Sequence, residues 1–122
     1  MSERTSKQLF RDYVDIWETG KLDKLRATIH DDYVGHSSWG DRDQEGLRQR
    51  IVAFRQKYPD VRFKIEDQLA EGDKVASRLI ATATRATDGQ QVFLHGLNIS
   101  RVADGRIIEE WMAWEMQPAE PS

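Results

Sequence analysis

The chain has 122 residues, 39% of them hydrophobic and 32% charged, with a formal net charge of −3. This length predicts one domain, and no apolar run approaches the roughly 20 residues of a membrane span or follows a signal-peptide pattern. The absence of cysteine excludes disulfides and a thiol nucleophile and agrees with a cytoplasmic location. The mild acidity and the unclustered histidines predict no nucleic-acid, membrane or metal partner.

Helical periodicity predicts three helices in the first half of the chain. The first begins at a cap, Ser2, and continues to Glu18. Its apolar stripe ends at Trp17, which fits either a core aromatic or the wall of a ligand pocket. The second helix covers residues 22–29. The third starts near Asp43 and continues to about residue 57, where a proline soon follows.

Residues 30–36, between the second and third helices, are expected to be extended or irregular, and residues 37–41 have the composition of a polar loop. His36 opens this loop. A lone loop histidine is more often an ordinary surface residue, but a loop between two helical layers can also rim a pocket. His36 is therefore a candidate for contact with a ligand.

From residue 61 onward the period changes from 3.6 to 2, which predicts strands at residues 61–66, 74–86 and 91–116, the last segment folding into a hairpin. Gly/Asp turns separate the strands, so local connections predict an antiparallel meander. Helices followed by strands indicate an α+β fold with the helices on one face of a curved sheet. We expect a single domain over residues 1–118 and a flexible tail at 119–122.

Two registers are possible for the hairpin around Asp104. A two-residue loop pairs Asn98 with Trp111, whereas a three-residue loop pairs Asn98 with Glu110. We favour the second, which places Asn98 and Glu110 on an otherwise apolar face together with Ile108, Met112 and Trp114. Ile107 and His95 then belong to the opposite face.

A carboxylate beside an amide in an apolar wall is the clearest candidate for chemistry. Glu110 is a possible base for removing a proton next to a carbonyl, and the Asn98 amide is a possible donor to the developing enolate oxygen. The alternative is that Glu110 pairs with Asn98, or with an arginine such as Arg78, and only stabilises the sheet.

Five segments resemble SnoaL-like polyketide cyclases of the nuclear transport factor 2-like superfamily: WETG at 17–20, HDDY at 30–33, YPD at 58–60, AEGD at 70–73 and RVADGRIIEEW at 101–111. The resemblance implies a cone, in which a curved antiparallel sheet wraps around three N-terminal helices and leaves a pocket in its mouth. It also implies association into a homodimer or higher homo-oligomer through the sheet. The ring closure typical of the family uses neither metal nor cofactor.

The resemblance also places the family's functional positions. Its aromatic residue at the end of the first helix corresponds to Trp17, its strand histidine to Asn98, and its acid/base aspartate to Met112. Methionine cannot transfer a proton. We therefore expect an apolar pocket lined by Trp17, Met112 and Trp114 for a small hydrophobic molecule. The protein is then either a cofactor-independent cyclase or isomerase using Glu110 and Asn98, or a non-catalytic ligand-binding or assembly protein.

Overall fold

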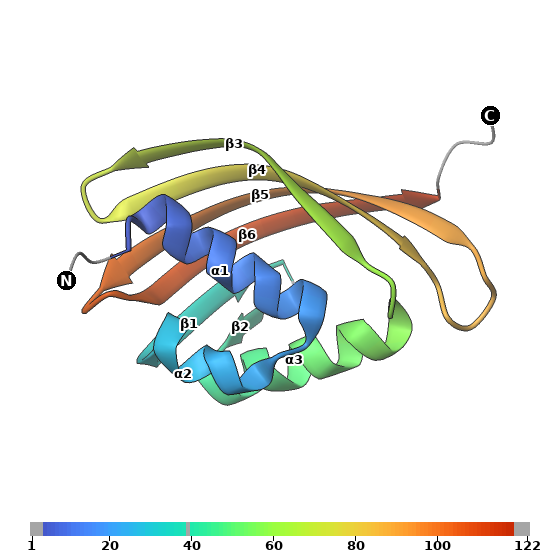
Figure 1. Ribbon diagram of the computed structural model, residues 1–122, viewed down its shortest axis with the longest axis horizontal. Helices are drawn as coiled ribbons and strands as arrows, with labels where there is room; N and C mark the ends of the chain where they lie inside the picture. The colour runs from blue at the N-terminus through green and yellow to red at the C-terminus, as the bar shows by residue number, and fades with distance from the viewer. Residues whose placement is uncertain (1–3, 39, 119–122) are drawn as a thin grey trace.

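A curved six-stranded sheet arches over the helices in the computed structural model, which describes residues 4–38 and 40–118 (Figure 1). In chain order the elements are α1 (Ser6–Thr19), η1 (Leu22–Lys24), α2 (Leu25–Thr28), β1 (Ile29–Ser37), β2 (Gly40–Arg42), α3 (Gln44–Lys57), β3 (Arg62–Glu71), β4 (Lys74–Thr84), β5 (Gln91–Ala103) and β6 (Arg106–Pro118). The strand order is β2-β1-β6-β5-β4-β3. The α+β prediction is confirmed, but the sheet is mixed, because β1 runs parallel to β6.

Capping side chains determine where the helices begin. Thr5 caps α1 by accepting a 3.1 Å hydrogen bond from the backbone N–H of Gln8. The predicted cap, Ser2, lies outside the described residues; the cap of α1 is Thr5, three residues later. The prediction of Asp43 at the start of α3 is confirmed, because its carboxylate accepts from the N–H of Gly46 at 2.8 Å.

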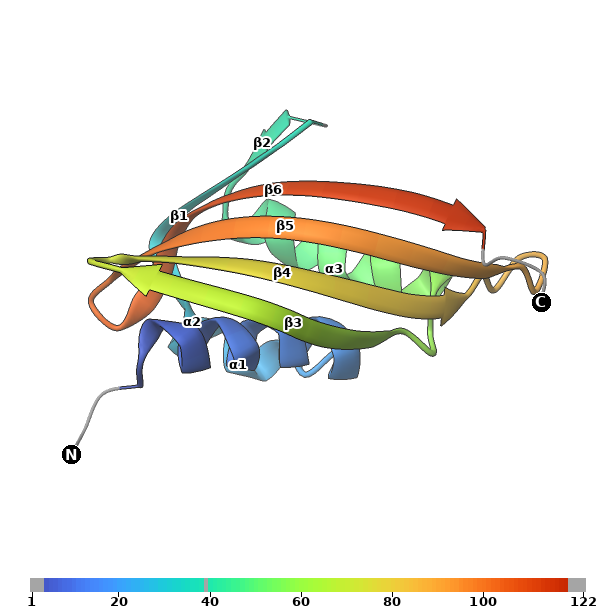
Figure 2. The ribbon, with the colours of Figure 1, turned by 90° about the horizontal axis from the view of Figure 1, so that it is seen from above.

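The segment between the second and third helices is a β-hairpin, which the sequence prediction missed. The expected second helix is reduced to a 3₁₀ turn and one α-helical turn, and the chain is already extended from Ile29. β1 lies between β2 and β6, with Gly35 next to Glu110 and His36 next to Trp111 (Figure 2). Its irregular pairing with β6 does not produce a regular alternation of apolar and polar residues, so the period-2 signal is absent.

The predicted hairpin exists, but neither expected register is the observed one. The turn has two residues, since both Asp104 and Gly105 have positive φ, 55° and 73°. Next to the turn, Val102 pairs with Ile107, but the following pair joins Arg101 and Glu109. Ile108 is therefore left out of the pairing and forms a bulge in β6. Asn98 therefore lies opposite Met112, and Ser100 lies opposite Glu110.

The bulge decides which isoleucine enters the core. Ile107 is fully buried, whereas Ile108, expected on the inner face, is only partly buried. Beyond the bulge the even-numbered residues of β6 do face inward, as expected. Glu110 and Met112 consequently share the concave face with Asn98.

The core fills the space between the concave face of the sheet and the helices. Its largest fully buried side chains include those of Tyr33, Phe10, Leu9, Ile16, Leu25, Ile29, Leu47, Ile51 and Ile107. α1 packs mainly on β3 and β4, and α3 packs mainly on β1. In the described part of the chain, no helix is long and apolar enough to cross a membrane.

Candidate functional site

Glu110 is the centre of a buried polar cluster on the concave face. Its side chain is essentially inaccessible, and its Oε1 accepts hydrogen bonds from the hydroxyls of Tyr13, at 2.6 Å, and Tyr33. Its Oε2 accepts a 2.8 Å hydrogen bond from the side-chain amide of Asn98, and Arg42 Nη2 lies 3.4 Å from Oε1. We call these five residues the Glu110 cluster. A carboxylate can be buried here because several donors replace the water it has lost.

Five different elements contribute to the Glu110 cluster. Tyr13 comes from α1, Tyr33 from β1, Arg42 from the end of β2, Asn98 from β5 and Glu110 from β6. The cluster therefore joins the first helix to both halves of the sheet. None of these contacts is local, since the paired residues are at least 12 positions apart.

Two small features orient the donors of the cluster. The hydroxyl of Ser100 donates to Oδ1 of Asn98 at 2.7 Å, which turns the amide nitrogen toward Glu110. At Gly35, a Cβ atom would lie 2.4 Å from the Tyr33 hydroxyl, so a larger residue there would displace it. The glycine thus leaves the space that the tyrosine needs to reach the carboxylate.

The ionisation states of the cluster follow from its burial. Desolvation raises the pKa of the Tyr13 hydroxyl well above its ordinary value, and the Glu110 carboxylate raises it further. The same two causes, in the same order, raise the pKa of Tyr33. Desolvation opposes the charge of Arg42, but the surrounding tyrosines and Glu110 raise its pKa overall. Both tyrosines thus remain neutral donors, and Arg42 remains a cation.

Trp17 and Met112, two of the predicted ligand-contact residues, adjoin the Glu110 cluster. Arg42 Nη2 lies 3.1 Å from Met112 Sδ, and the guanidinium carbon is 5.9 Å from the centroid of the Trp17 ring. Trp114 lies further along the same face, 40% exposed, with its ring packed over Gly96. The concave face therefore carries a partly open aromatic surface beside a buried polar cluster.

His36 does not join this group. Its side chain lies with those of Glu109 and Trp111 on the outer face of the sheet, where its ring nitrogens are 2.8 Å from Glu109 and 3.0 Å from Asp41. Hydrogen bonds to Glu109 and then to Asp41 raise the pKa of His36, whereas hydrogen bonds from His36 and then Arg101 lower the pKa of Glu109. The segment expected to form a loop at the rim of a pocket is instead the pair of strands β1 and β2. His36, on β1, links both strands to β6 through its contacts with Asp41 and Glu109.

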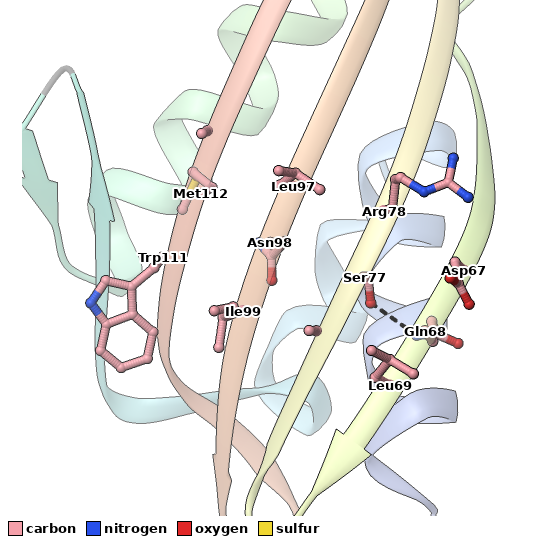
Figure 3. A pocket seen from close by; sticks show the side chains of 12 residues that line it. Asp67, Gln68, Leu69, Ser77, Arg78, Leu97, Asn98, Ile99, Trp111 and Met112 are labelled. Carbon is pink, nitrogen blue, oxygen red and sulfur yellow. Dashed lines mark hydrogen bonds between the residues drawn. The ribbon is translucent and has the colours of Figure 1, made fainter.

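The outer face also carries an open groove of about 460 Å³ (Figure 3). Exposed apolar side chains lie across it on β3, β5 and β6: Leu69, Leu97, Ile99 and Trp111. Arg78 lines the same groove and pairs with Glu66 at 2.8 Å. The suggested pairing of Glu110 with Arg78 is therefore wrong, and the arginine beside Glu110 is Arg42.

Sequence reasoning missed three members of the cluster, namely Tyr13, Tyr33 and Arg42. Tyr13 carried one usable signal, because a tyrosine in an apolar helical stripe needs a partner for its hydroxyl. Tyr33 and Arg42 offered none, since their strands were not predicted. Among residues 4–38 and 40–118, no group of three or more His, Asp or Glu side chains is arranged to hold a metal ion.

Comparison with known proteins gives one family and several similar structures. The sequence profile of the SnoaL-like polyketide cyclase family matches residues 7–121. IdmH from Streptomyces antibioticus, a proposed polyketide cyclase, aligns with a TM-score of 0.84 and 26% identity over 92% of this chain and 93% of that one. A proposed polyketide cyclase from Bacillus cereus ATCC 10987 aligns with a TM-score of 0.79 and 28% identity, covering 88% and 72% of the two chains.

AclR from Streptomyces galilaeus, a proposed hydroxylase, has a TM-score of 0.81 and 25% identity, with 92% of this chain and 79% of that one covered. No curated protein matches the chain. The family match extends over nearly all of the sequence, and the solved structures share the same cone of sheet and helices. The chain therefore belongs to the SnoaL-like polyketide cyclase family, within the nuclear transport factor 2-like superfamily.

Proposed function

We propose that this protein is a cofactor-independent cyclase or isomerase that removes a proton next to a carbonyl group of a polyketide-like or other cyclic substrate. Membership of the family supports the reaction class, as do similar structures proposed to be polyketide cyclases. One observation carries the proposal. Glu110 is a fully buried carboxylate on the concave face, and Arg42 lies between it and Met112 of the partly open aromatic surface.

The substrate rings would pack against Trp17, Met112 and Trp114. These side chains present flat or flexible apolar surface, and Trp114 has 40% of its surface exposed without a ligand. Met112 lies between Glu110 and Trp114 on the same face of β6, so it would have to move for a ligand on Trp114 to meet the carboxylate. A methionine has three rotatable bonds, so it can move aside without disturbing the sheet.

Proton transfer would use Oε2 of Glu110. Oε1 already accepts from two tyrosines, whereas among the described residues Oε2 accepts from Asn98 alone and has a lone pair left. Glu110 would take the proton from the carbon next to the carbonyl, and the C–H electron pair would form an enolate. The second N–H of the Asn98 amide would donate to the enolate oxygen. In a cyclase the enolate carbon would attack a second carbonyl, and the alkoxide formed would take the proton back from Glu110. In an isomerase Glu110 would return the proton to another carbon of the enolate system.

Exchange of solvent deuterium into 1-tetralone tests this proposal, because enolisation is detectable by proton NMR without the natural substrate. We expect the protein to accelerate exchange and Glu110→Gln to reduce the acceleration by about 100-fold or more, the usual contribution of a general base. Glu115→Gln, an exposed position on the same strand and the opposite face, is the matched control and should behave as the wild type. Full exchange activity in a folded Glu110→Gln protein would exclude the proposed role.

A second candidate function is non-catalytic binding of a small hydrophobic molecule. The supporting observation is that Glu110 has no exposed surface. The resemblance, which places Met112 at the position of the family's acid, favours the same function. This function predicts that 1-tetralone binds without exchange of its protons. It also predicts equal affinity in Glu110→Gln, because the carboxylate would then contribute only to the fold.

We also propose that two copies associate through the outer face. Leu97 and Ile99 are 61% and 45% exposed at the centre of the groove, and Trp111 extends the apolar area. A second copy is the simplest occupant, because a two-fold axis through this area lays the same apolar side chains against each other. Sedimentation velocity should show a dimer for the wild type and a monomer for Leu97→Asp, and a wild-type monomer at micromolar concentration would contradict the proposal.

A further inference from the structure

Arg42 is a buried cation whose donors are incompletely used. Its side chain is 11% exposed, and its Nε is buried with no hydrogen-bond partner among the described residues. Its Nη2 contacts Met112 Sδ at 3.1 Å, and a thioether sulfur is a weak acceptor. Arg42 also hydrogen-bonds to Tyr33, and its buried Nε lies beside Gly35. The Nη2 that touches Met112 is therefore the donor with capacity for a better acceptor.

Glu110 neutralises Arg42 only in part. The contact between them is 3.4 Å long, at the limit of a hydrogen bond, whereas Tyr13 and Asn98 reach the same carboxylate at 2.6 and 2.8 Å. Together with the hydroxyl of Tyr33, these neutral donors satisfy much of the acceptor capacity of Glu110. Nη2 of Arg42 is therefore not held by a short hydrogen bond to Glu110, and it meets the concave face at Met112.

Arg42 is also placed where a ligand on the concave face would meet it. Its guanidinium carbon is 5.9 Å from the centre of the Trp17 ring, and its Nη2 touches Met112. Trp17 and Met112 are two of the apolar residues expected to hold the rings of the ligand. A ring compound packed there would bring its polar substituents beside the guanidinium.

We propose that Arg42 selects hydrophobic ring compounds that carry an anionic oxygen, in the form of a carboxylate or an ionised enol. Guanidinium groups bind such oxygens through short, charge-assisted hydrogen bonds. The inference rests on the proposed function for the location of the ligand and extends it to a substrate class. In the reaction, Arg42 would bind the oxygen on which the enolate charge develops, and Trp17 would hold the ring.

Binding of 2-naphthoate and its neutral analogue 2-naphthamide tests the inference, because the two differ chiefly in charge. Quenching of tryptophan fluorescence and isothermal titration calorimetry measure both affinities. We expect the wild type to bind 2-naphthoate at least 10-fold more tightly than 2-naphthamide. Arg42→Gln should reduce this preference to within about twofold, and Arg42→Lys, which keeps the charge but loses the planar fork, should retain part of it.

Two further variants locate the effect. Arg78→Gln removes an arginine that lines the groove on the outer face and should leave the preference for 2-naphthoate unchanged. Glu110→Gln removes the carboxylate that competes for Arg42, so it should bind 2-naphthoate several-fold more tightly while losing proton exchange. A failure of exchange in the wild type would therefore contradict the proposed reaction and leave the selection of anions intact.

Four results would overturn the inference. They are equal wild-type affinity for the two compounds, no measurable binding of either at millimolar concentration, an unchanged preference in folded Arg42→Gln, and loss of the preference in Arg78→Gln. The comparison of acid and amide in the wild type needs no variant. It therefore remains decisive even if Arg42→Gln does not fold.

Discussion

Removal of the two tyrosine hydroxyls from the Glu110 cluster tests whether the cluster stabilises the fold. Tyr13→Phe and Tyr33→Phe each keep the aromatic ring, so packing is preserved and one hydrogen bond to Oε1 of Glu110 is lost. A hydrogen bond to a charged group contributes about 1.5–3 kcal/mol to the free energy of unfolding. Each variant should lose about that amount, which is a large part of the roughly 5–15 kcal/mol typical of a domain.

The double variant should lose more than the sum of the two single losses. With one hydroxyl absent, the other still satisfies Oε1 of Glu110, but with both absent only the long contact to Arg42 remains on that oxygen. We expect a coupling energy of at least about 0.5 kcal/mol, the lower range for residues that share one network. Both tyrosines donate to the same atom, so an additive result would be hard to reconcile with the structure.

Urea unfolding followed by tryptophan fluorescence and circular dichroism measures these losses, provided that the two signals agree on a two-state transition. Tyr58→Phe is the matched control. The Tyr58 hydroxyl donates to Met116 Sδ at 3.2 Å, a weak acceptor, and also hydrogen-bonds to Arg85, but it does not touch Glu110. Its removal should cost about 1 kcal/mol or less. Losses below about 0.5 kcal/mol for Tyr13→Phe and Tyr33→Phe would show that the cluster does not stabilise the protein.

Three further predictions follow from the pKa shifts and the packing. The raised pKa values of the two cluster tyrosines provide stability that is complete below their unfolded value of about 10 and is lost as the pH rises above it. The free energy of unfolding should therefore fall above pH 10, and it should fall less in the double phenylalanine variant. Gly96→Ala would place Cβ 2.6 Å from the Trp114 ring, so the ring should move outward and the free energy of unfolding should fall by about 1–3 kcal/mol. The tryptophan emission should shift to the red, and unchanged emission would contradict this packing. His36, with a raised pKa, contributes stability below its ordinary pKa of 6.5, and Glu109, with a lowered pKa, contributes stability above its ordinary pKa of 4.5. His36→Gln should therefore destabilise the protein more at pH 5.5 than at pH 8.5. An equal loss at both pH values would exclude an ion pair between His36 and Glu109.

The hairpin shows both the strength and the limit of sequence reasoning for this fold. The sequence Asp104-Gly105 between two apolar runs located the turn, and alternation placed Glu110 and Asn98 on the inner face. The favoured register was wrong because the turn has two residues instead of three and because a bulge at Ile108 adds one residue to β6. No local pattern marked that bulge, since Ile107 and Ile108 are identical in type and either can enter the core.

The Glu110 cluster could be predicted only in part, and the reason differs from the one that affected the register of the hairpin. Glu110 and Asn98 lie in one hairpin, so alternation along two neighbouring strands brings them together. Tyr33 and Arg42 come from strands whose pairing depends on a parallel contact between β1 and β6, which joins residues far apart in the sequence. A partner for a buried carboxylate was foreseeable on physical grounds, but its identity required the tertiary structure.

Met112 and Arg42 together provide a final test, because Met112, which the resemblance places at the acid/base position, touches the arginine. The carboxylate oxygen of an aspartate is as many bonds from Cα as Met112 Sδ, which lies 3.1 Å from Arg42 Nη2. Met112→Asp should therefore pair with Arg42 and abolish the preference for 2-naphthoate over 2-naphthamide, whereas Met112→Asn, of the same size and neutral, should retain most of it. An unchanged preference in a folded Met112→Asp protein would mean that ligand anions do not meet Arg42 at this position. With methionine present, no carboxylate from position 112 competes for Arg42, so Nη2 stays available to the anionic oxygen of a ligand.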